Sequence, residues 1–301
     1  MHISNNVKKI LERYESDSPG TKVNLARILT HGKMANTGKL IIFPVDQGFE
    51  HGPRAFTANS AGYDPHYHYQ LAVDAGVSAF AAPLGLLEAG ASTYAGQVPT
   101  ILKINSSNGL SVKQDQALTA TIAEALRLGC SAIGITIYPG AQESLEMFEE
   151  AKELAAEAKS CGLAVIIWSY PRGPNISSAG ETALNVVAYS AHMAALLGAH
   201  IIKVKFPTSY VEDNETAPFY RDIPAEQPQD RIKHIVQSCF AGRRLVVFSG
   251  GTKKDNASVL SDAQAIQKGG GSGSIIGRNM FQRPREESLE LFEQIVDVYT
   301  N

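Results

Sequence analysis

A single (β/α)8 barrel is the fold class that this sequence predicts, and three observations point to it. Eight short apolar segments alternate with segments of helical character, and no linker interrupts the series. The 301 residues suffice for one large barrel, and 44% hydrophobic with 19% charged residues is the balance of an α/β enzyme. Unusual polar residues gather where the apolar segments end, which is where such a barrel carries its active site.

The barrel is expected to span 39–301, after a helical extension at 1–38. Residues 3–34 have the pattern of two short helices with a turn at 18–20. Because they precede every strand, we expect them to cap one end of the fold or to contact another copy of the chain. The glycines at 269–273 predict a tight turn into the last strand, since too little chain follows them for a further domain.

Each element has its own local signal. Asp64 and Pro65 form a typical helix start, an N-cap followed by proline. Helices are predicted at 64–75, 115–128, 143–159, 181–197, 231–239 and 286–299, and a polar loop at 47–53. Strands are predicted at 39–46, 78–83, 100–105, 131–138, 164–170, 199–207, 244–249 and 274–277, all short apolar runs.

The composition argues against several classes of protein. The net charge is −3, and no basic stripe or polybasic cluster suggests binding to nucleic acid or to an anionic membrane. The sequence shows neither a signal-peptide pattern nor a run of transmembrane length. Its three widely spaced cysteines fit reduced thiols better than a disulfide framework or a zinc site, so we expect a cytoplasmic protein.

Two lysines interrupt the apolar strand at 199–207. Lys203 and Lys205 share one face of that strand because side chains alternate. Burial and a neighbouring cation both lower the pKa of a lysine, and a neutral amine can form a Schiff base with a carbonyl. Lys203 lies deeper, so we expect it to be the nucleophile, with Lys205 adding repulsion from nearer the mouth. The plainer alternative is a strand-end lysine in a surface ion pair.

Other strand ends carry polar groups that fit the same site. Trp168 and Tyr170 share a strand face, and a phenol can hold and exchange a proton at neutral pH. They could instead be two core aromatics. Asp46 could hold substrate hydroxyls or cap a loop. Lys103 is either another cation in the mouth or part of a buried structural pair.

The last two strands are followed by glycine-rich segments. Glycines let backbone N–H groups approach a phosphate, and Arg278 can add a charged fork. A barrel phosphate site commonly follows these two strands, and ordinary turn glycines are the alternative. The segments are 249–254, with Ser249, Gly250 and Gly251, and 277–279, with Gly277 and Arg278.

A metal-dependent mechanism finds little support in the histidines. A metal centre would need histidines at several strand ends with carboxylate support. Only His51 is suitably placed, whereas His200 lies at the start of its strand. We therefore expect neither a metal ion nor another cofactor.

Taken in order, the motifs resemble those of the archaeal and bacterial type class I fructose-bisphosphate aldolases, the DhnA type. The resemblance covers roughly 39–299. It is carried by PVDQGFEHG at 44–52, IYPG at 137–140, WSYPR at 168–172, IKVK at 202–205, SGG at 249–251 and GRN at 277–279. Gln47 stands where many archaeal members have histidine.

The resemblance implies a (β/α)8 barrel that cleaves fructose 1,6-bisphosphate to dihydroxyacetone phosphate and glyceraldehyde 3-phosphate without a metal. We also expect the protein to assemble as a homo-oligomer. By motif position, Lys203 corresponds to the Schiff-base lysine, Tyr170 to the general acid/base and Asp46 to the neighbouring carboxylate. The implied substrate contacts are Gln47, Trp168, Arg172, Lys205, Ser249, Gly250, Gly251, Gly277 and Arg278.

Two other hypotheses about the function are compatible with the sequence. One is a related Schiff-base enzyme, transaldolase or thiolase-like, that acts on another phosphorylated ketose. The other is a non-catalytic barrel that binds sugar phosphates, against which the combination of Lys203, Tyr170 and Asp46 argues.

Overall fold

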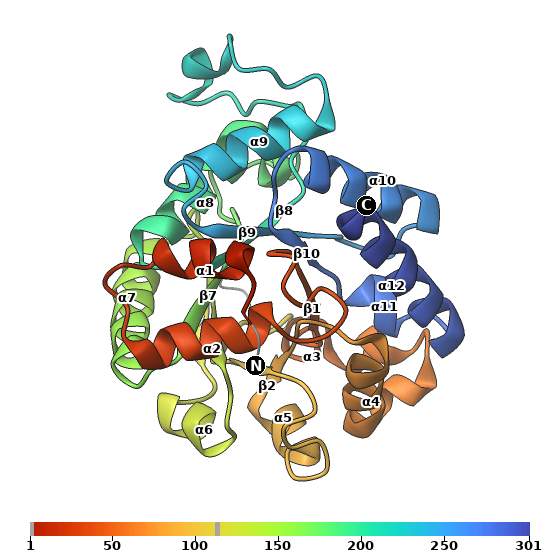
Figure 1. Cartoon of the computed structure of the whole chain (residues 1–301). Coiled ribbons are helices and arrows are strands. Elements are labelled where there is room, and N and C mark those ends of the chain that lie inside the picture. Colours follow the sequence, from red (N-terminus) through yellow and green to blue (C-terminus); the bar gives the residue numbers. More distant parts are fainter. Residues whose placement is uncertain (1–2, 112–114) are drawn as a thin grey trace.

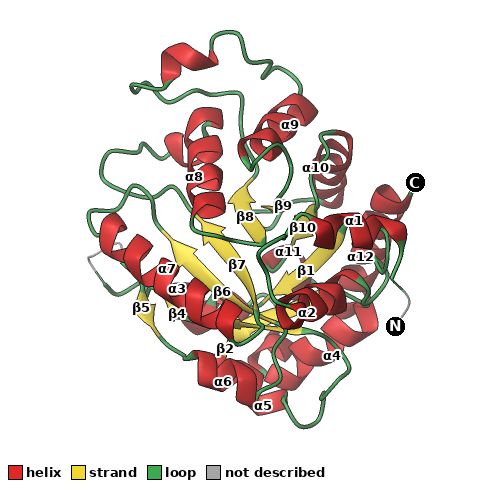
Figure 2. Ribbon diagram, turned by 60° about the vertical axis from the view of Figure 1, so that its left-hand side comes forward, coloured by secondary structure: helices red, strands yellow, loops and turns green. Residues whose placement is uncertain are grey.

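The computed structural model describes residues 3–111 and 115–301, and its centre is a closed barrel of eight parallel strands. Helices surround the strands (Figure 2). Neighbouring strands follow the order β1-β10-β9-β8-β7-β6-β3-β2, which closes on itself. The barrel strands are β1 (Leu40–Pro44), β2 (Ala79–Pro83), β3 (Thr100–Lys103), β6 (Ala132–Ile137), β7 (Ala164–Ser169), β8 (Ile201–Lys205), β9 (Leu245–Ser249) and β10 (Gly273–Ile275). The predicted barrel is confirmed.

The helices follow the strands as the sequence pattern indicates. Asp64 accepts a hydrogen bond from the His66 N–H at the start of the helix that Pro65 opens, which confirms the predicted N-cap. The α-helices are α1 (Asn5–Glu12), α2 (Pro19–Leu29), α3 (Gly48–His51), α4 (Pro65–Ala75), α5 (Leu84–Gly90), α6 (Ile122–Arg127), α7 (Ser144–Ser160), α8 (Leu184–Leu196), α9 (Pro228–Ser238), α10 (Asn256–Lys268), α11 (Arg278–Phe281) and α12 (Arg285–Thr300).

Some predicted elements were wrong or missed. The helix expected at 115–128 begins only at Ile122, after the capping box of Thr121 and Glu124. The segment before it forms β5 (Ala117–Leu118), which pairs antiparallel with β4 (Asn105–Ser106) beside the barrel mouth. Helices α5 and α10 were not predicted, and the expected loop at 47–53 contains the short helix α3. The glycines at 269–273 do turn directly into β10, as predicted.

Side-chain alternation along the strands separates the two main clusters of the core. Ile202 and Val204 of β8 point outward into the cluster between strands and helices. Ile201 points inward into the barrel interior, where Ile42, Ile101 and Ile166 from other strands join it. Lys203 and Lys205 share that inward face by alternation, which places both toward the barrel axis.

The N-terminal helices close the end of the barrel where the strands begin. Figure 1 shows α1 and α2 lying across the barrel. Val7, Ile10 and Leu25 from these helices belong to the same apolar cluster as the barrel interior. Of the two predicted roles for the extension, the capping role is confirmed, and the chain from α1 through α2 is called the floor below.

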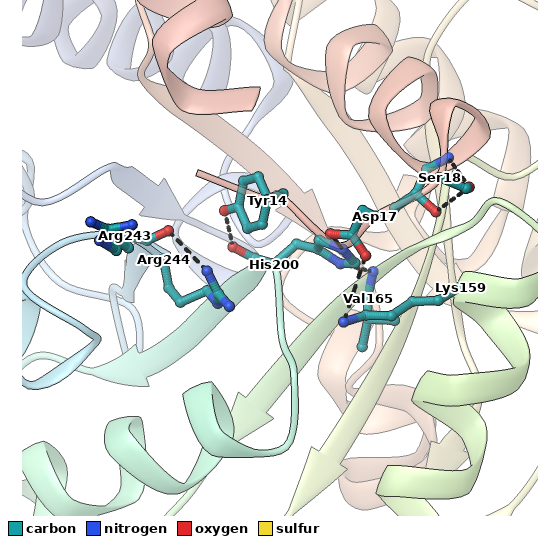
Figure 3. Close-up of polar contacts among 9 residues, drawn as sticks. Tyr14, Asp17, Ser18, Lys159, Val165, His200, Arg243 and Arg244 are labelled. Carbon is teal, nitrogen blue, oxygen red and sulfur yellow. Dashed lines mark hydrogen bonds and ion pairs between the residues drawn. The ribbon is translucent and has the colours of Figure 1, made fainter. Parts of the chain in front are cut away.

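A buried polar network fixes the floor to the barrel (Figure 3). The Nδ1 atom of His200 accepts from the Val165 N–H at 2.8 Å, and its Nε2 atom donates to Asp17 at 2.8 Å. The Tyr14 hydroxyl donates to the His200 carbonyl at 2.6 Å. The Asp17 carboxylate also pairs with Lys159 at 3.8 Å. Floor, β7 and β8 are therefore tied together at the starts of the strands.

Candidate active site

A cavity of about 490 Å³ opens where the barrel strands end. Its walls come from the carboxyl ends of β1, β3, β6, β7, β8, β9 and β10 or from the segments that follow them. Every site residue predicted from the sequence lines this cavity except Trp168. The residues that the structure brings together are Asp46, Gln47, Tyr170, Arg172, Lys203, Lys205, Ser249, Gly250, Gly251, Gly277 and Arg278.

Trp168 lies inside the barrel and is fully buried. The register pairs it with Thr136 on one side and Lys203 on the other. A Cβ atom at Gly134 would come within 2.5 Å of the indole, so the glycine makes room for the ring. Trp168 therefore packs against the Lys203 side chain instead of lining the cavity, and its expected direct contact with substrate has no support in this arrangement.

Lys203 is 3% exposed, and its amine faces the cavity from the barrel axis. Burial is the main cause that lowers the pKa of Lys203, to about 8. The Arg278 and Arg172 charges lower it further, whereas the Asp46 and Glu50 carboxylates raise it. Within the described residues the amine makes no hydrogen bond; its Nζ lies 5.3 Å from the centre of the Trp168 ring. Such an amine is available for attack on a carbonyl.

Tyr170 follows β7 and lies next to this amine. The Lys203 Nζ is 5.3 Å from the centre of the Tyr170 ring. Burial raises the pKa of the Tyr170 hydroxyl far above its usual value, and the Asp46 carboxylate raises it further. The phenol therefore holds its proton at neutral pH, as a general acid must.

Lys205 differs from the expectation in its electrostatic role. It lines the cavity one step nearer the mouth than Lys203, but its ammonium pairs with Glu181. The pair largely cancels its charge, and the cations that lower the pKa of Lys203 are Arg278 and Arg172 instead. Alternation along one strand could not reveal Glu181, which lies in the segment before α8.

The two glycine-rich segments after β9 and β10 form one continuous part of the wall. The Asn279 side chain donates from Nδ2 to the Thr252 carbonyl at 3.1 Å and accepts from the Lys254 N–H at 2.8 Å. Gly251 has a φ of 71°, which favours glycine. A Cβ atom at Gly277 would come within 2.6 Å of the Pro44 carbonyl oxygen. The segments thus pack closely while leaving Arg278 on the cavity wall.

Arg172 is held on the opposite side of the mouth. It pairs with Glu50 of α3 at 2.6 Å and donates to the Tyr138 hydroxyl at 3.1 Å. Its guanidinium lies 5.1 Å from the Tyr138 ring centre and 5.5 Å from that of Tyr170. The cavity therefore carries the cations Arg172 and Arg278 on two sides, with Lys203 at its inner end.

Several residues of the cavity were not predicted from the sequence. Glu50 went unnoticed because its partner is far along the chain. Thr136 and Asn105 lie at inward positions of strand ends, a signal that the alternation pattern could have revealed. Gln116 was not predicted either; its buried Oε1 atom, like that of the predicted Gln47, lines the cavity and has no hydrogen-bond partner among the described residues. They are acceptors available to a ligand with hydroxyl groups.

Two findings bear on metal binding and membranes. Among residues 3–111 and 115–301, no group of three His, Cys, Asp or Glu side chains could hold a metal ion. Across the same ranges, the helices are too short or too polar to span a lipid bilayer.

Residues 40–283 match the sequence model of the DeoC/LacD family aldolases. The chain belongs to this family.

The DeoC/LacD family assignment agrees with individual relatives. The chain is 35% identical to the class 1 fructose-bisphosphate aldolase of Thermoproteus tenax, over 83% of this chain and 86% of that protein. It is 33% identical to a probable class 1 fructose-bisphosphate aldolase of Chlamydia pneumoniae, over 92% of this chain and 83% of that protein. The resemblance inferred from the motifs is confirmed.

A solved structure of this family shares the architecture. It is an archaeal fructose-1,6-bisphosphate aldolase with its catalytic lysine covalently bound to the carbinolamine intermediate of the substrate. Its sequence is 32% identical, its TM-score is 0.75, and the match covers 89% of this chain and 96% of that chain. A second solved structure, 32% identical with a TM-score of 0.75 over 88% of this chain and 96% of that chain, is of a Schiff-base-forming fructose-1,6-bisphosphate aldolase.

Proposed function

We propose that the protein is a class I aldolase that cleaves fructose 1,6-bisphosphate reversibly to dihydroxyacetone phosphate and glyceraldehyde 3-phosphate. The observation that carries the proposal is the buried Lys203 amine, free of hydrogen bonds within the described residues and next to the Tyr170 ring. The class 1 relatives and their Schiff-base chemistry support the same reaction.

The first step is bond formation between the Lys203 nitrogen and C2 of the ketose. The carbonyl oxygen leaves as water, taking one proton from the amine and one from an acid such as Tyr170, so that the nitrogen keeps its second proton. The product is an iminium cation, which attracts electrons from the neighbouring carbon. The pKa of Lys203, lowered to about 8, keeps a useful fraction of the amine neutral near physiological pH.

The second step breaks the C3–C4 bond. The C4 hydroxyl loses its proton, the first product leaves as an aldehyde, and the electron pair of the broken bond moves toward the iminium to give an enamine. A proton added to C3 restores the iminium, and water then releases the ketone and the free lysine. We propose that Tyr170 exchanges these protons and that Asp46 orients the hydroxyls.

The cations on the cavity wall are proposed to bind the two phosphates. Arg278, with the backbone of the Ser249–Gly251 and Gly277 segments, is assigned to one phosphate, and Arg172 to the other. Binding at both ends holds the reacting carbons against Lys203. Gln47 is proposed to bind a substrate hydroxyl.

We propose a cytoplasmic homo-oligomer that acts in glycolysis or gluconeogenesis. The three free cysteines, two of them buried, support a reducing compartment. We also propose that the chain divides into the floor segment at 1–38 and the barrel at 39–301; the family match that begins at residue 40 supports this division.

One experiment tests the function directly. The protein is incubated with fructose 1,6-bisphosphate, and triose phosphate release is measured with and without borohydride. Cleavage that borohydride abolishes, with the adduct on Lys203, is the expected result. Cleavage of a different phosphorylated ketose only would point to a transaldolase-like or thiolase-like enzyme, and binding without turnover to a sugar-phosphate sensor.

A further inference from the structure

Gln116 lines the active-site cavity, and the reaction proposed above gives it no role. The residue is only 8% exposed, and its Oε1 atom is buried without a hydrogen-bond donor from residues 3–111 or 115–301. A buried carbonyl oxygen that lacks a donor costs free energy. Such a group in the wall of a cavity is suited to accept a hydrogen bond from a bound molecule.

The short ribbon of β4 and β5 brings Gln116 to the cavity. Gln116 directly precedes β5, and this ribbon is separate from the sheet of the barrel. The register pairs Ser106 with Ala117, so one step further along the ribbon Gln116 stands opposite Ser107. Gln116 is therefore positioned by an addition to the barrel and not by one of the eight barrel strands.

The contacts of Ser107 assign Gln116 to the Arg172 side of the cavity. The Ser107 hydroxyl lies 3.0 Å from the Tyr138 hydroxyl, and Arg172 donates to the same Tyr138 oxygen at 3.1 Å. Gln116, Ser107, Tyr138 and Arg172 therefore follow one another along one wall. Arg278 begins α11 on the other side of the cavity.

The two arginines differ in their distance from Lys203. Burial is the main cause that lowers the pKa of Lys203, and the Arg278 charge lowers it more than the Arg172 charge does. Because the effect of a charge weakens with distance, Arg278 is the nearer of the two. In fructose 1,6-bisphosphate the C1 phosphate is next to C2, which Lys203 attacks, and the C6 phosphate is at the far end of the carbon chain. Arg278 therefore fits the C1 phosphate and Arg172 the C6 phosphate.

This orientation decides which substrate group faces Gln116. A phosphate dianion has acceptor atoms only and cannot donate to the Oε1 atom, whereas a hydroxyl can. The C3 and C4 hydroxyls are on the reacting carbons, where the proposed mechanism places Tyr170 and Asp46. The C5 hydroxyl remains, between the reacting carbons and the phosphate assigned to Arg172.

We propose that Gln116 is a specificity-determining residue whose Oε1 atom accepts a hydrogen bond from the C5 hydroxyl of the bound ketose bisphosphate. The proposal rests on the proposed aldolase function, which supplies the orientation of the carbon chain. It narrows the substrate class to phosphorylated ketoses with a hydroxyl on the carbon before the distal phosphate. An analogue without that hydroxyl leaves the buried acceptor unpaired and is therefore a poorer substrate.

Cleavage of two matched substrates tests this contact. Fructose 1,6-bisphosphate and 5-deoxyfructose 1,6-bisphosphate differ in the C5 hydroxyl, and both release dihydroxyacetone phosphate, which is measured. In Gln116→Met, kcat/KM for fructose 1,6-bisphosphate should fall about tenfold, the effect of one hydrogen bond, and kcat/KM for the 5-deoxy substrate should not fall. Comparing each substrate between variant and unaltered protein cancels differences intrinsic to the sugars, such as ring closure.

Two further variants separate the contact from packing. Gln97→Met changes an exposed glutamine that donates to the Thr93 carbonyl at 3.0 Å, and it should affect neither substrate. Gln116→Asn keeps the amide but withdraws it by one carbon, so it should lower kcat/KM for fructose 1,6-bisphosphate alone. This variant keeps the proposal testable if Gln116→Met does not fold.

The outcomes separate this proposal from the proposed function. Equal losses for both substrates would give Gln116 a role in packing only, and an unchanged kcat/KM for fructose 1,6-bisphosphate would exclude the contact; either result overturns the proposal. Calorimetric binding of both bisphosphates to Lys203→Met, with and without Gln116→Met, makes the same comparison without turnover. If Gln116→Met weakens binding of fructose 1,6-bisphosphate alone and the unaltered protein cleaves neither sugar, the contact holds and the aldolase assignment fails.

Discussion

The Lys203 amine lies 5.3 Å from the centre of the Tyr170 ring, so the proposed nucleophile and proton donor come from adjacent strands of the barrel. The amine and the phenol have opposite requirements for their protons. The amine must lose a proton to attack, and the phenol must keep one to donate it. Burial pushes both groups toward their neutral forms, which lowers the pKa of Lys203 and raises that of Tyr170.

Tyr170→Phe should retain Schiff-base formation and lose most turnover. The change removes one oxygen and leaves the ring packed, and general acid/base groups contribute about 10²–10⁴-fold to rate. Steady-state cleavage and borohydride trapping measure the two properties separately. Tyr138→Phe is the matched control in the same cavity and should lose less. Near-normal turnover of Tyr170→Phe would assign the proton transfer to Tyr138 or Asp46.

Lys203→Met should abolish borohydride trapping, whereas Lys205→Met should retain it with weaker substrate binding. Lys205 is paired with Glu181, and its removal leaves that carboxylate unpaired beside an anionic substrate. Peptide mapping after reduction with fructose 1,6-bisphosphate identifies the modified residue. An adduct on Lys205 or Lys103 would contradict the assignment of Lys203.

Arg278→Ala should weaken binding of phosphorylated ligands much more than binding of their unphosphorylated analogues. A hydrogen bond to a charged group contributes about 1.5–3 kcal/mol. Calorimetric titration of both ligand types gives the difference. Arg285→Ala, which removes an arginine paired with Asp74 on α4, is the control and should bind both types normally. Equal losses for both ligand types in Arg278→Ala would show that this arginine contacts no phosphate.

Cleavage activity should survive EDTA. The proposed mechanism uses the iminium as the electron acceptor, so it needs no metal ion to stabilise the carbanion. The assay compares initial rates before and after prolonged chelation and dialysis. Activity that disappears on chelation and returns with zinc would rule out the metal-free mechanism.

Asp17→Ala should lower the free energy of unfolding by about 1–3 kcal/mol, because it leaves the buried His200 Nε2–H without its acceptor. Glu15→Ala, whose side chain is 82% exposed and 3.7 Å from Arg243, should change it little. Urea denaturation of the three proteins measures the difference. Equal stabilities would mean that the network contributes nothing.

The free energy of unfolding of the unaltered protein should also decrease as the pH is lowered. Burial lowers the pKa of His200 below its usual value, although the Asp17 hydrogen bond partly opposes this. The unfolded chain therefore binds a proton near pH 6.5 that the folded protein does not. The stabilising contribution is complete above that pH and is lost as the pH falls toward the folded pKa. Urea midpoints at pH 7.5 and 5.5 test the direction.

Local patterns predicted the parts of this molecule that depend on alternation. The inward positions of Lys203 and Tyr170 follow from period-two strands, and the barrel follows from eight such strands in series. Helix α10 was also within reach, since Asp255 caps it by accepting from the Ser258 N–H. The predictions that were wrong or missing concern residues whose roles depend on partners far away in the sequence.

Partner choice is a property of the folded chain. Glu50 and Arg172 are 122 residues apart in sequence, and Glu181 reaches Lys205 from a different segment. The short ribbon that includes Ala117–Leu118 formed where a helix was expected, because pairing with Asn105–Ser106 outweighed local propensity. Trp168 has the alternation of a mouth residue, and only the depth of its packing excludes it from the cavity.

The floor has a consequence for the order of folding during synthesis. The hydrogen bond between Asp17 and His200 joins residues 183 positions apart in the chain, and Tyr14 bonds to the same residue. Neither bond can form until His200 has been synthesised. Contacts of such long sequence separation form late, because a large loop must close before they are gained. The segment that the ribosome makes before the barrel is therefore among the last to dock. Until it docks, the apolar side chains at the end of the barrel where the strands begin remain exposed to water and accessible to chaperones.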